Sequence, residues 1–121
     1  MSWRKNYHFA GYPVNTEKIR ELADEYDMWI LEDSCHAPGA YFIDSKGEKV
    51  YCGSGKYSDM AIFSFHPVKH IAAGEGGMIT TDNEELAEKA KLLRTHGITK
   101  DPNKLTRNDG PWYYEMQELG Y

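Results

Sequence analysis

Hydrophobic residues fall in short blocks along the chain, and the spacing within each block predicts the element that it forms. Tyr7–Gly11 is a brief aromatic-rich run ended by glycine and proline, which is typical of a buried strand and a turn. Apolar residues then recur at helical spacing as far as Tyr26, and either Asn15 or Thr16 fits the N-cap. The continuous apolar block Met28–Leu31 predicts a strand that is covered on both faces. Strand, helix and strand in this order predict the crossover unit of a parallel sheet.

The middle of the chain continues the succession of strands and turns. Two runs of alternating polarity, Ala40–Ile43 and Glu48–Tyr51, flank a polar turn and predict a hairpin. The apolar block Met60–Phe65 predicts a third strand of the sheet, and Met78–Thr81 predicts a fourth. We therefore expect an α/β fold of three layers around a mostly parallel sheet.

The last third of the chain has a different character. A second helix is predicted after an N-cap at Asp82 or Asn83, and it ends near Gly97. Residues 99–110 are polar and include a proline, so we expect a mobile loop there. Pro111–Tyr114 is a dense aromatic cluster, and a short helix is predicted to follow it. An apolar cluster with no element to cover it indicates either a partner surface or a covering segment beyond this sequence.

The composition narrows the class of protein. The 121 residues, 13.9 kDa, correspond to one domain or to a piece of a larger one. A net charge of −5 argues against non-specific nucleic-acid binding. A hydrophobic fraction of 40% is too high for a disordered chain, and no apolar run approaches the ~20 residues of a membrane span. The amino-terminal residues have positive charge but no apolar stretch behind them, so we expect no signal peptide and a cytoplasmic protein.

The cysteines and histidines do not predict a metal site. Cys35 and Cys52 are too few for a disulfide framework, and both are expected to be reduced. Cys52, His66 and His70 raise the hypothesis of a zinc site, but zinc motifs usually start from a close pair of cysteines. Pro67 lies between the two histidines and disrupts the helical spacing that a ligand pair would need. We therefore expect no metal.

Two glycine-bearing stretches resemble nucleotide-binding loops only in part. In Gly53–Lys56 the lysine is followed by Tyr57, where a P-loop needs serine or threonine. Gly74–Gly77 precedes a predicted strand, whereas the dinucleotide-binding fingerprint opens a helix. Both stretches are predicted to be turns.

Four polar residues fall where two of the predicted strands end. Asp33 and His36 follow one strand, and Ser64 and Lys69 lie at and beyond the end of another. If these strands are neighbours, all four side chains point into one crevice. The apolar residues around Lys69 in the sequence would lower the pKa of its amine toward that of a nucleophile. Simpler roles stay open on this pattern alone: Asp33 as a cap, Ser64 at a strand end, His36 in the core and Lys69 facing water.

Three stretches taken together resemble a known family. Glu32–Ala40 (EDSCHAPGA), Phe63–Lys69 (FSFHPVK) and Gly74–Gly77 (GEGG) closely resemble the DegT/StrS family of sugar aminotransferases. These enzymes depend on pyridoxal 5′-phosphate (PLP) and have fold type I. The resemblance therefore implies the large domain of an aspartate aminotransferase-like transferase, with its mostly parallel sheet.

The resemblance extends over nearly the whole chain, from about His8 to Tyr121. Arg94–Ile98 and Gly110–Glu115 resemble the branch of the family that makes UDP-4-amino-4,6-dideoxy-N-acetyl-altrosamine, on the pseudaminic acid pathway of polysaccharide biosynthesis. The implied reaction is amino transfer from glutamate to the 4-keto group of a nucleotide-linked sugar. Some relatives carry histidine in place of the lysine and dehydrate their substrate instead, and Lys69 argues against that branch.

The resemblance also implies a role for each of the four residues. Lys69 would hold PLP as a Schiff base and, once displaced by the amino donor, would move the proton. Asp33 would pair with the protonated pyridine nitrogen. His36 would hydrogen-bond the phenolic oxygen of the cofactor, and Ser64, five residues before the lysine, would bind its phosphate.

Members of this family are much longer than 121 residues. The resemblance places residues 1–121 in the middle of the large domain, with an N-terminal segment and a small C-terminal domain absent. Exposed sheet edges and apolar surface would favour a homo-oligomer, and we expect the isolated chain to be inactive. The alternative hypothesis is a non-catalytic α/β module that self-associates through Trp112, Tyr113 and Tyr114. Neither hypothesis includes a nucleic-acid or membrane partner.

Overall fold

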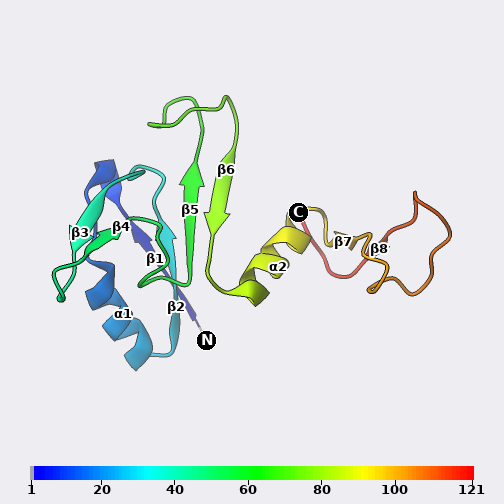
Figure 1. Ribbon diagram of the computed structural model, residues 1–121, viewed down its shortest axis with the longest axis horizontal. Helices are drawn as coiled ribbons and strands as arrows, with labels where there is room; N and C mark the ends of the chain where they lie inside the picture. Colours follow the sequence, from blue (N-terminus) through cyan, green and yellow to red (C-terminus); the bar gives the residue numbers. More distant parts are fainter. Residues whose placement is uncertain (1) are drawn as a thin grey trace. The chain divides into compact units, whose positions relative to one another are not determined.

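The computed structural model describes residues 2–121 (Figure 1). The chain divides into two compact units, one running to Asp82 and the other from Asn83 to Tyr121. Each unit is described by itself. No helix among the described residues is long and apolar enough to cross a membrane.

The first unit is built on a four-stranded sheet with the order β1-β2-β5-β6. β2 pairs in parallel with β1 on one side and with β5 on the other, while β6 runs antiparallel to β5. The predicted α/β class and the mostly parallel sheet are therefore confirmed. The strands are β1 (Ser2–Tyr7), β2 (Met28–Asp33), β5 (Met60–Ser64) and β6 (Gly77–Thr80).

The predicted strand at Tyr7–Gly11 is wrong, because the first strand lies earlier in the chain. Ser2–Tyr7 forms β1, and Phe9–Gly11 is a short 3-10 helix, η1. Ala10 has φ 53° and Gly11 φ 81°, a left-handed conformation that cannot continue a strand. β1 is the edge strand of the sheet and is mostly exposed, so its polar sequence gives no strand signal.

Helix α1 (Thr16–Glu25) confirms the predicted crossover between β1 and β2. The Asn15 side chain caps it by accepting a hydrogen bond from the Lys18 amide at 3.1 Å. Thr16 and Ala23 are the buried residues of the helix, which contacts β2. The helix therefore returns the chain so that β2 lies parallel to β1.

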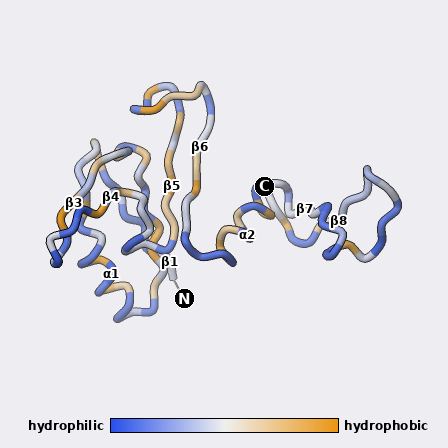
Figure 2. Tube along the Cα trace, in the orientation of Figure 1, coloured by the Kyte–Doolittle hydropathy of each residue, from blue (hydrophilic) through white to orange (hydrophobic). Residues whose placement is uncertain are grey.

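The predicted hairpin is also confirmed. Its strands, β3 (Tyr41–Ile43) and β4 (Lys49–Tyr51), pair antiparallel in a small sheet of their own. The Asp44 carboxylate holds the turn by accepting hydrogen bonds from the amides of Lys46 and Glu48. Figure 2 shows hydrophobic stretches along β5, one of the two central strands of the main sheet. The apolar core of this unit is small and consists of Ala23, Ile30, Ala37, Val50, Cys52 and Ala61.

The second unit begins with helix α2 (Glu84–Leu93), whose predicted cap at Asn83 is confirmed by a 3.1 Å bond from the Leu86 amide. The short helix predicted after the aromatic cluster is wrong. The chain there forms β8 (Glu115–Met116), which pairs antiparallel with β7 (Ile98–Thr99). Between these strands the chain is mostly hydrophilic (Figure 2). The predicted mobility of residues 99–110 stays a prediction.

Candidate functional site

The carboxyl ends of β1, β2 and β5 meet at one edge of the sheet, because these three strands are parallel. Tyr7 of β1 stands opposite Asp33 of β2, and Asp33 stands opposite Ile62 of β5. Ser64 lies two positions beyond Ile62, at the end of β5. The neighbouring strands that the sequence interpretation required are therefore present, and this edge is where ligands bind in parallel sheets.

Asp33 is a buried carboxylate that the structure keeps ionised. Only 7% of the residue is exposed. Its Oδ1 accepts a hydrogen bond from the Cys35 amide at 3.2 Å, and its Oδ2 lies 2.8 Å from Lys5 Nζ. Burial alone would raise the pKa of Asp33, but the hydrogen bonds from Cys35 and Lys5 outweigh burial and lower it. Asp33 therefore presents a negative charge at neutral pH, suited to a cationic N–H group.

His36 lies beside aromatic rings at the same edge. The Tyr7 hydroxyl is 2.8 Å from Nδ1 of the ring and 3.1 Å from Nε2. The His36 ring is 5.2 Å from the Tyr7 ring and 6.2 Å from the Phe9 ring, centroid to centroid. His36 is only half-buried, so its ring remains open to a further partner.

Lys69 lies in the loop that joins β5 to β6. Backbone hydrogen bonds from Phe65 to Gly76 and from Ala73 to Phe65 hold the base of this loop. The predicted apolar cover around Lys69 is not found among the described residues, since Val68 is 79% and Ile71 55% exposed. Within residues 2–121 the Lys69 amine makes no hydrogen bond or ion pair with another side chain.

Cys35 links the lysine loop electrostatically to the strand edge. Burial and then the negative charge of Asp33 raise the pKa of the Cys35 thiol to about 11, while the positive charge of Lys69 acts in the opposite direction. Lys69 is thus close enough to influence a residue that hydrogen-bonds Asp33. Ser64 is a neighbour of the same loop, and its Oγ accepts a weak bond from the His66 amide at 3.4 Å. Asp33 and His36 thus follow β2, while Ser64 ends the neighbouring β5 and Lys69 lies in the loop after it, and their joint role as one site stays a prediction.

Glu32, although next to Asp33 in the chain, belongs to a different group of residues. Its carboxylate accepts hydrogen bonds from His8 Nε2 at 2.8 Å, from the Gly53 amide at 2.6 Å and from Ser58 Oγ at 2.8 Å. The His8 ring is fully buried and accepts a bond at Nδ1 from the Val14 amide. Burial opposes ionisation of Glu32, yet these hydrogen bonds lower its pKa. This group is a structural hub that joins four segments.

The hub also includes Cys52, one of the three residues of the zinc hypothesis. Cys52 lies beside His8 and Glu32, with the three potential ligand atoms within 4.8 Å of one another. Both ring nitrogens of His8 and both oxygens of Glu32 already have hydrogen-bond partners, so the cluster is satisfied without an ion. His66 and His70, which the zinc hypothesis grouped with Cys52, are exposed residues of the lysine loop.

Two residues of this edge were missed by the sequence interpretation. Lys5 and Tyr7 lie on β1, and their side chains contact Asp33 and His36. A strand signal at Ser2–Tyr7 would have placed them on one face, because alternate residues of a strand point the same way. That signal is weak, since the mostly exposed edge strand has polar residues at four of its six positions.

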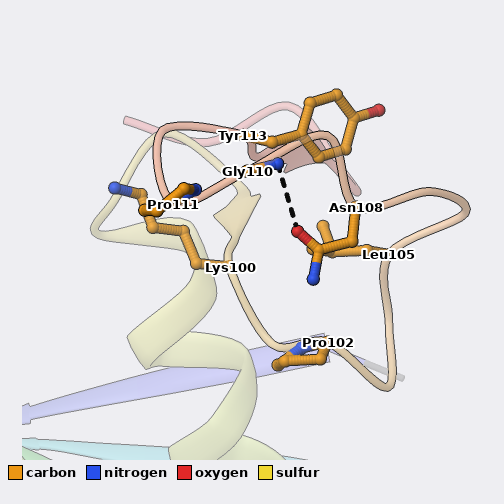
Figure 3. Close-up of a pocket in the computed structure, with 7 residues that line it drawn as sticks. All are labelled: Lys100, Pro102, Leu105, Asn108, Gly110, Pro111 and Tyr113. Atoms are coloured by element: carbon orange, nitrogen blue, oxygen red, sulfur yellow. Dashed lines mark hydrogen bonds between the residues drawn. The ribbon is translucent and has the colours of Figure 1, made fainter.

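The second unit contains a separate hollow of about 400 Å³ (Figure 3). The Gly110 amide donates to Asn108 Oδ1 at 3.4 Å across its rim. None of the four predicted site residues lines this hollow. The lining has one ammonium group, that of Lys100, but no carboxylate and no histidine. The lining residues are Lys100, Pro102, Leu105, Asn108, Gly110, Pro111 and Tyr113.

Comparison with known proteins identifies relatives over nearly the whole chain. Residues 6–120 match the DegT/DnrJ/EryC1/StrS aminotransferase family. The UDP-4-amino-4,6-dideoxy-N-acetyl-beta-L-altrosamine transaminase of Campylobacter jejuni serotype O:2 is 46% identical over 113 residues, which cover 93% of this chain and 26% of the relative. The uncharacterized protein MJ1066 of Methanocaldococcus jannaschii is 47% identical over 114 residues, which cover 94% of this chain and 28% of the relative. The chain thus spans about a quarter of the length of these relatives.

Solved structures show the same fold. Helicobacter pylori PseC, an aminotransferase involved in the biosynthesis of pseudoaminic acid, matches with a TM-score of 0.73 and 31% identity, covering 97% of this chain and 28% of that one. NtdA from Bacillus subtilis, solved with bound cofactor PMP, matches with a TM-score of 0.73 and 26% identity. The match covers 99% of this chain and 23% of that one. The predicted fold of the PLP-dependent transferase large domain is confirmed.

Proposed function

The chain belongs to the DegT/DnrJ/EryC1/StrS aminotransferase family, and from this premise we propose that it forms the PLP site of an enzyme that transfers an amino group to a nucleotide-linked sugar. The observation that supports this most strongly is the ionised, buried Asp33 at the end of β2, with Lys69 in the loop that follows the neighbouring strand β5. When bound, PLP supplies an electron sink for amino transfer.

The residues present fit the cofactor. The Asp33 carboxylate would accept a hydrogen bond from the protonated ring nitrogen of PLP, and its negative charge would favour the protonated form. The His36 ring would donate to the ring oxygen, and the Ser64 hydroxyl would donate to the phosphate. The Lys69 amine would hold the cofactor and would carry the proton during amino transfer. Each role uses a polar atom at the carboxyl edge of the parallel strands.

The substrate proposal rests on the named relatives. A transaminase of an amino-dideoxy sugar nucleotide is 46% identical to this chain, and a structural relative serves pseudoaminic acid biosynthesis. We infer a 4-keto sugar nucleotide as acceptor, glutamate as donor, a homo-oligomeric enzyme and a cytoplasmic location. Trp112, which is 68% exposed, and the neighbouring Tyr114 supply apolar surface for self-association.

Covalent labelling tests the cofactor site. PLP is added to the protein, the bond to lysine is reduced with borohydride, and peptide mass spectrometry locates the added mass. We expect labelling at Lys69 at PLP concentrations that leave the exposed Lys100 unmodified. Asp33→Asn should weaken the Lys69 labelling, and Asp27→Asn, an exposed acid that removes the same charge, is the control. Equal labelling of both lysines, or no effect of Asp33→Asn, would contradict the proposal.

The non-catalytic alternative makes a different prediction in the same experiment. A module that only self-associates would show no preference for Lys69, and its oligomer would dissociate when Trp112 and Tyr114 are replaced by serine. The labelling distinguishes the two functions, because both predict that the double variant dissociates in analytical ultracentrifugation.

A further inference from the structure

Asp33 has its second oxygen occupied by a side chain of the protein itself. Oδ1 accepts from the Cys35 amide, and Oδ2 forms a 2.8 Å ion pair with Lys5 Nζ. Lys5 and Tyr7 lie on the same face of β1, and Tyr7 contacts His36 in turn. The edge strand thus supplies one partner to each of two residues of the proposed cofactor site.

The protonated ring nitrogen of PLP and the ammonium of Lys5 both need a negatively charged hydrogen-bond acceptor. Each is a cationic N–H donor that gains most from a carboxylate oxygen. Asp33 carries a single negative charge, so the two cations compete for it, and Oδ1 already accepts a bond from the Cys35 amide. Lys5 also lies outside residues 6–120, which match the family, whereas Asp33 lies inside them. The family match therefore gives no role to Lys5.

We propose that Lys5 competes with the cofactor ring nitrogen for Asp33, so that PLP binds only after displacing the Lys5 ammonium from Oδ2. This inference rests on the proposed function, since it takes Asp33 as the partner of the ring nitrogen. The Lys5 side chain is 58% exposed, so its ammonium can move into water. It therefore lowers the affinity for the cofactor without closing the site.

The size of the effect follows from the exposure of the ion pair. Exposed ion pairs contribute little to stability, which corresponds to a change in a dissociation constant of about fivefold at most. Removing the Lys5 ammonium should therefore tighten cofactor binding by about three- to fivefold at low ionic strength. High salt should reduce the difference between wild type and variant, because salt screens the ion pair.

Calorimetric titration with pyridoxamine 5′-phosphate tests this inference. The probe has the PLP ring and phosphate but no aldehyde, so it cannot react with other lysines. Lys5→Met should bind the probe more tightly than wild type, while Lys5→Arg should resemble wild type. Arg4→Met is the matched control, because it removes the same charge from the neighbouring position on the other face of β1. Equal or weaker binding by Lys5→Met overturns the inference.

A second measurement separates the inference from the proposed function. In protein without any ligand, carbon NMR of the Asp33 carboxyl should show a higher pKa in Lys5→Met than in wild type, because the ion pair is lost. An unchanged pKa would overturn the inference while leaving the proposed function intact. If neither wild type nor any variant binds the probe, the proposed function fails and the inference fails with it.

Discussion

His8 Nε2 and the Glu32 carboxylate form a buried 2.8 Å hydrogen bond, which joins the turn after β1 to strand β2. The Val14 amide donates to Nδ1, so the proton that His8 donates to Glu32 is on Nε2. The carboxylate of the adjacent Asp33 lies at the sheet edge, where it contacts the Cys35 amide and Lys5. Two neighbouring acids therefore serve different purposes, one structural and one in the candidate site.

Replacing Glu32 should destabilise the first unit strongly. Glu32→Ala leaves the donors of His8, Gly53 and Ser58 without their acceptor in a buried position, which costs about 3–5 kcal/mol. Chemical denaturation measures the loss. Glu21→Ala, on the exposed face of α1, is the control and should change the free energy of unfolding by less than about 0.5 kcal/mol. A similar small change for Glu32→Ala would mean that the hub does not support the fold.

Gly53 should not tolerate a side chain. A Cβ at this position would lie 2.2 Å from Cζ of Phe63, and the backbone has φ 79°. Gly53→Ala should therefore lower the free energy of unfolding by more than about 2 kcal/mol. Gly47→Ala has nearly the same φ, 80°, but open space around it, so it isolates the backbone cost of about 1 kcal/mol. The steric explanation is wrong if both variants lose equal stability.

Glu115 should make the order of the β7–β8 loop depend on pH. Hydrogen bonds from the Thr106 side chain and amide, and from the Tyr113 hydroxyl, lower the pKa of Glu115 to about 2 from its usual 4.5. Because the pKa is lower in the folded state, the stabilisation is complete above pH 4.5 and is lost as the pH falls toward about 2. The NMR shift of the Thr106 amide should report this transition.

Two variants check the assignment of that transition. Glu115→Gln should remove the pH dependence of the Thr106 shift altogether. Tyr113→Phe deletes one of the donors and should move the midpoint toward higher pH. A midpoint near 4.5 in the wild-type protein would show that the hydrogen bonds to Glu115 are not maintained in solution.

Ser64 should contribute to binding of the phosphate and to no other part of the cofactor. Ser64→Ala is expected to weaken pyridoxamine 5′-phosphate binding by about 10- to 150-fold, because hydrogen bonds to charged groups contribute about 1.5–3 kcal/mol. Binding of pyridoxamine, which lacks the phosphate, should be unchanged. Ser54→Ala, at an exposed position of the same unit, is the control. Equal weakening for both ligands would assign Ser64 a structural role at the strand end.

Elements that depend on local signals were predictable from the sequence. Helix α1 and its Asn15 cap, the apolar strand β2, the hairpin and the Asn83 cap of α2 all follow from spacing and capping chemistry within a few residues. The family resemblance, confirmed by the match to residues 6–120, likewise depends on short motifs. Asp33, His36, Ser64 and Lys69 were identified from their places at the predicted strand ends, while their individual roles came from these motifs and remain predictions.

The polar β1, the strand β8 and the different environments of Glu32 and Asp33 were decided by tertiary structure. β1 forms because β2 offers hydrogen bonds along its whole length, and β8 because Ile98 pairs with Met116. The sequence determined which residues carry charge and where helices begin. Only long-range strand pairing decided that Lys5 meets Asp33, because register and alternation set which distant side chains share a face.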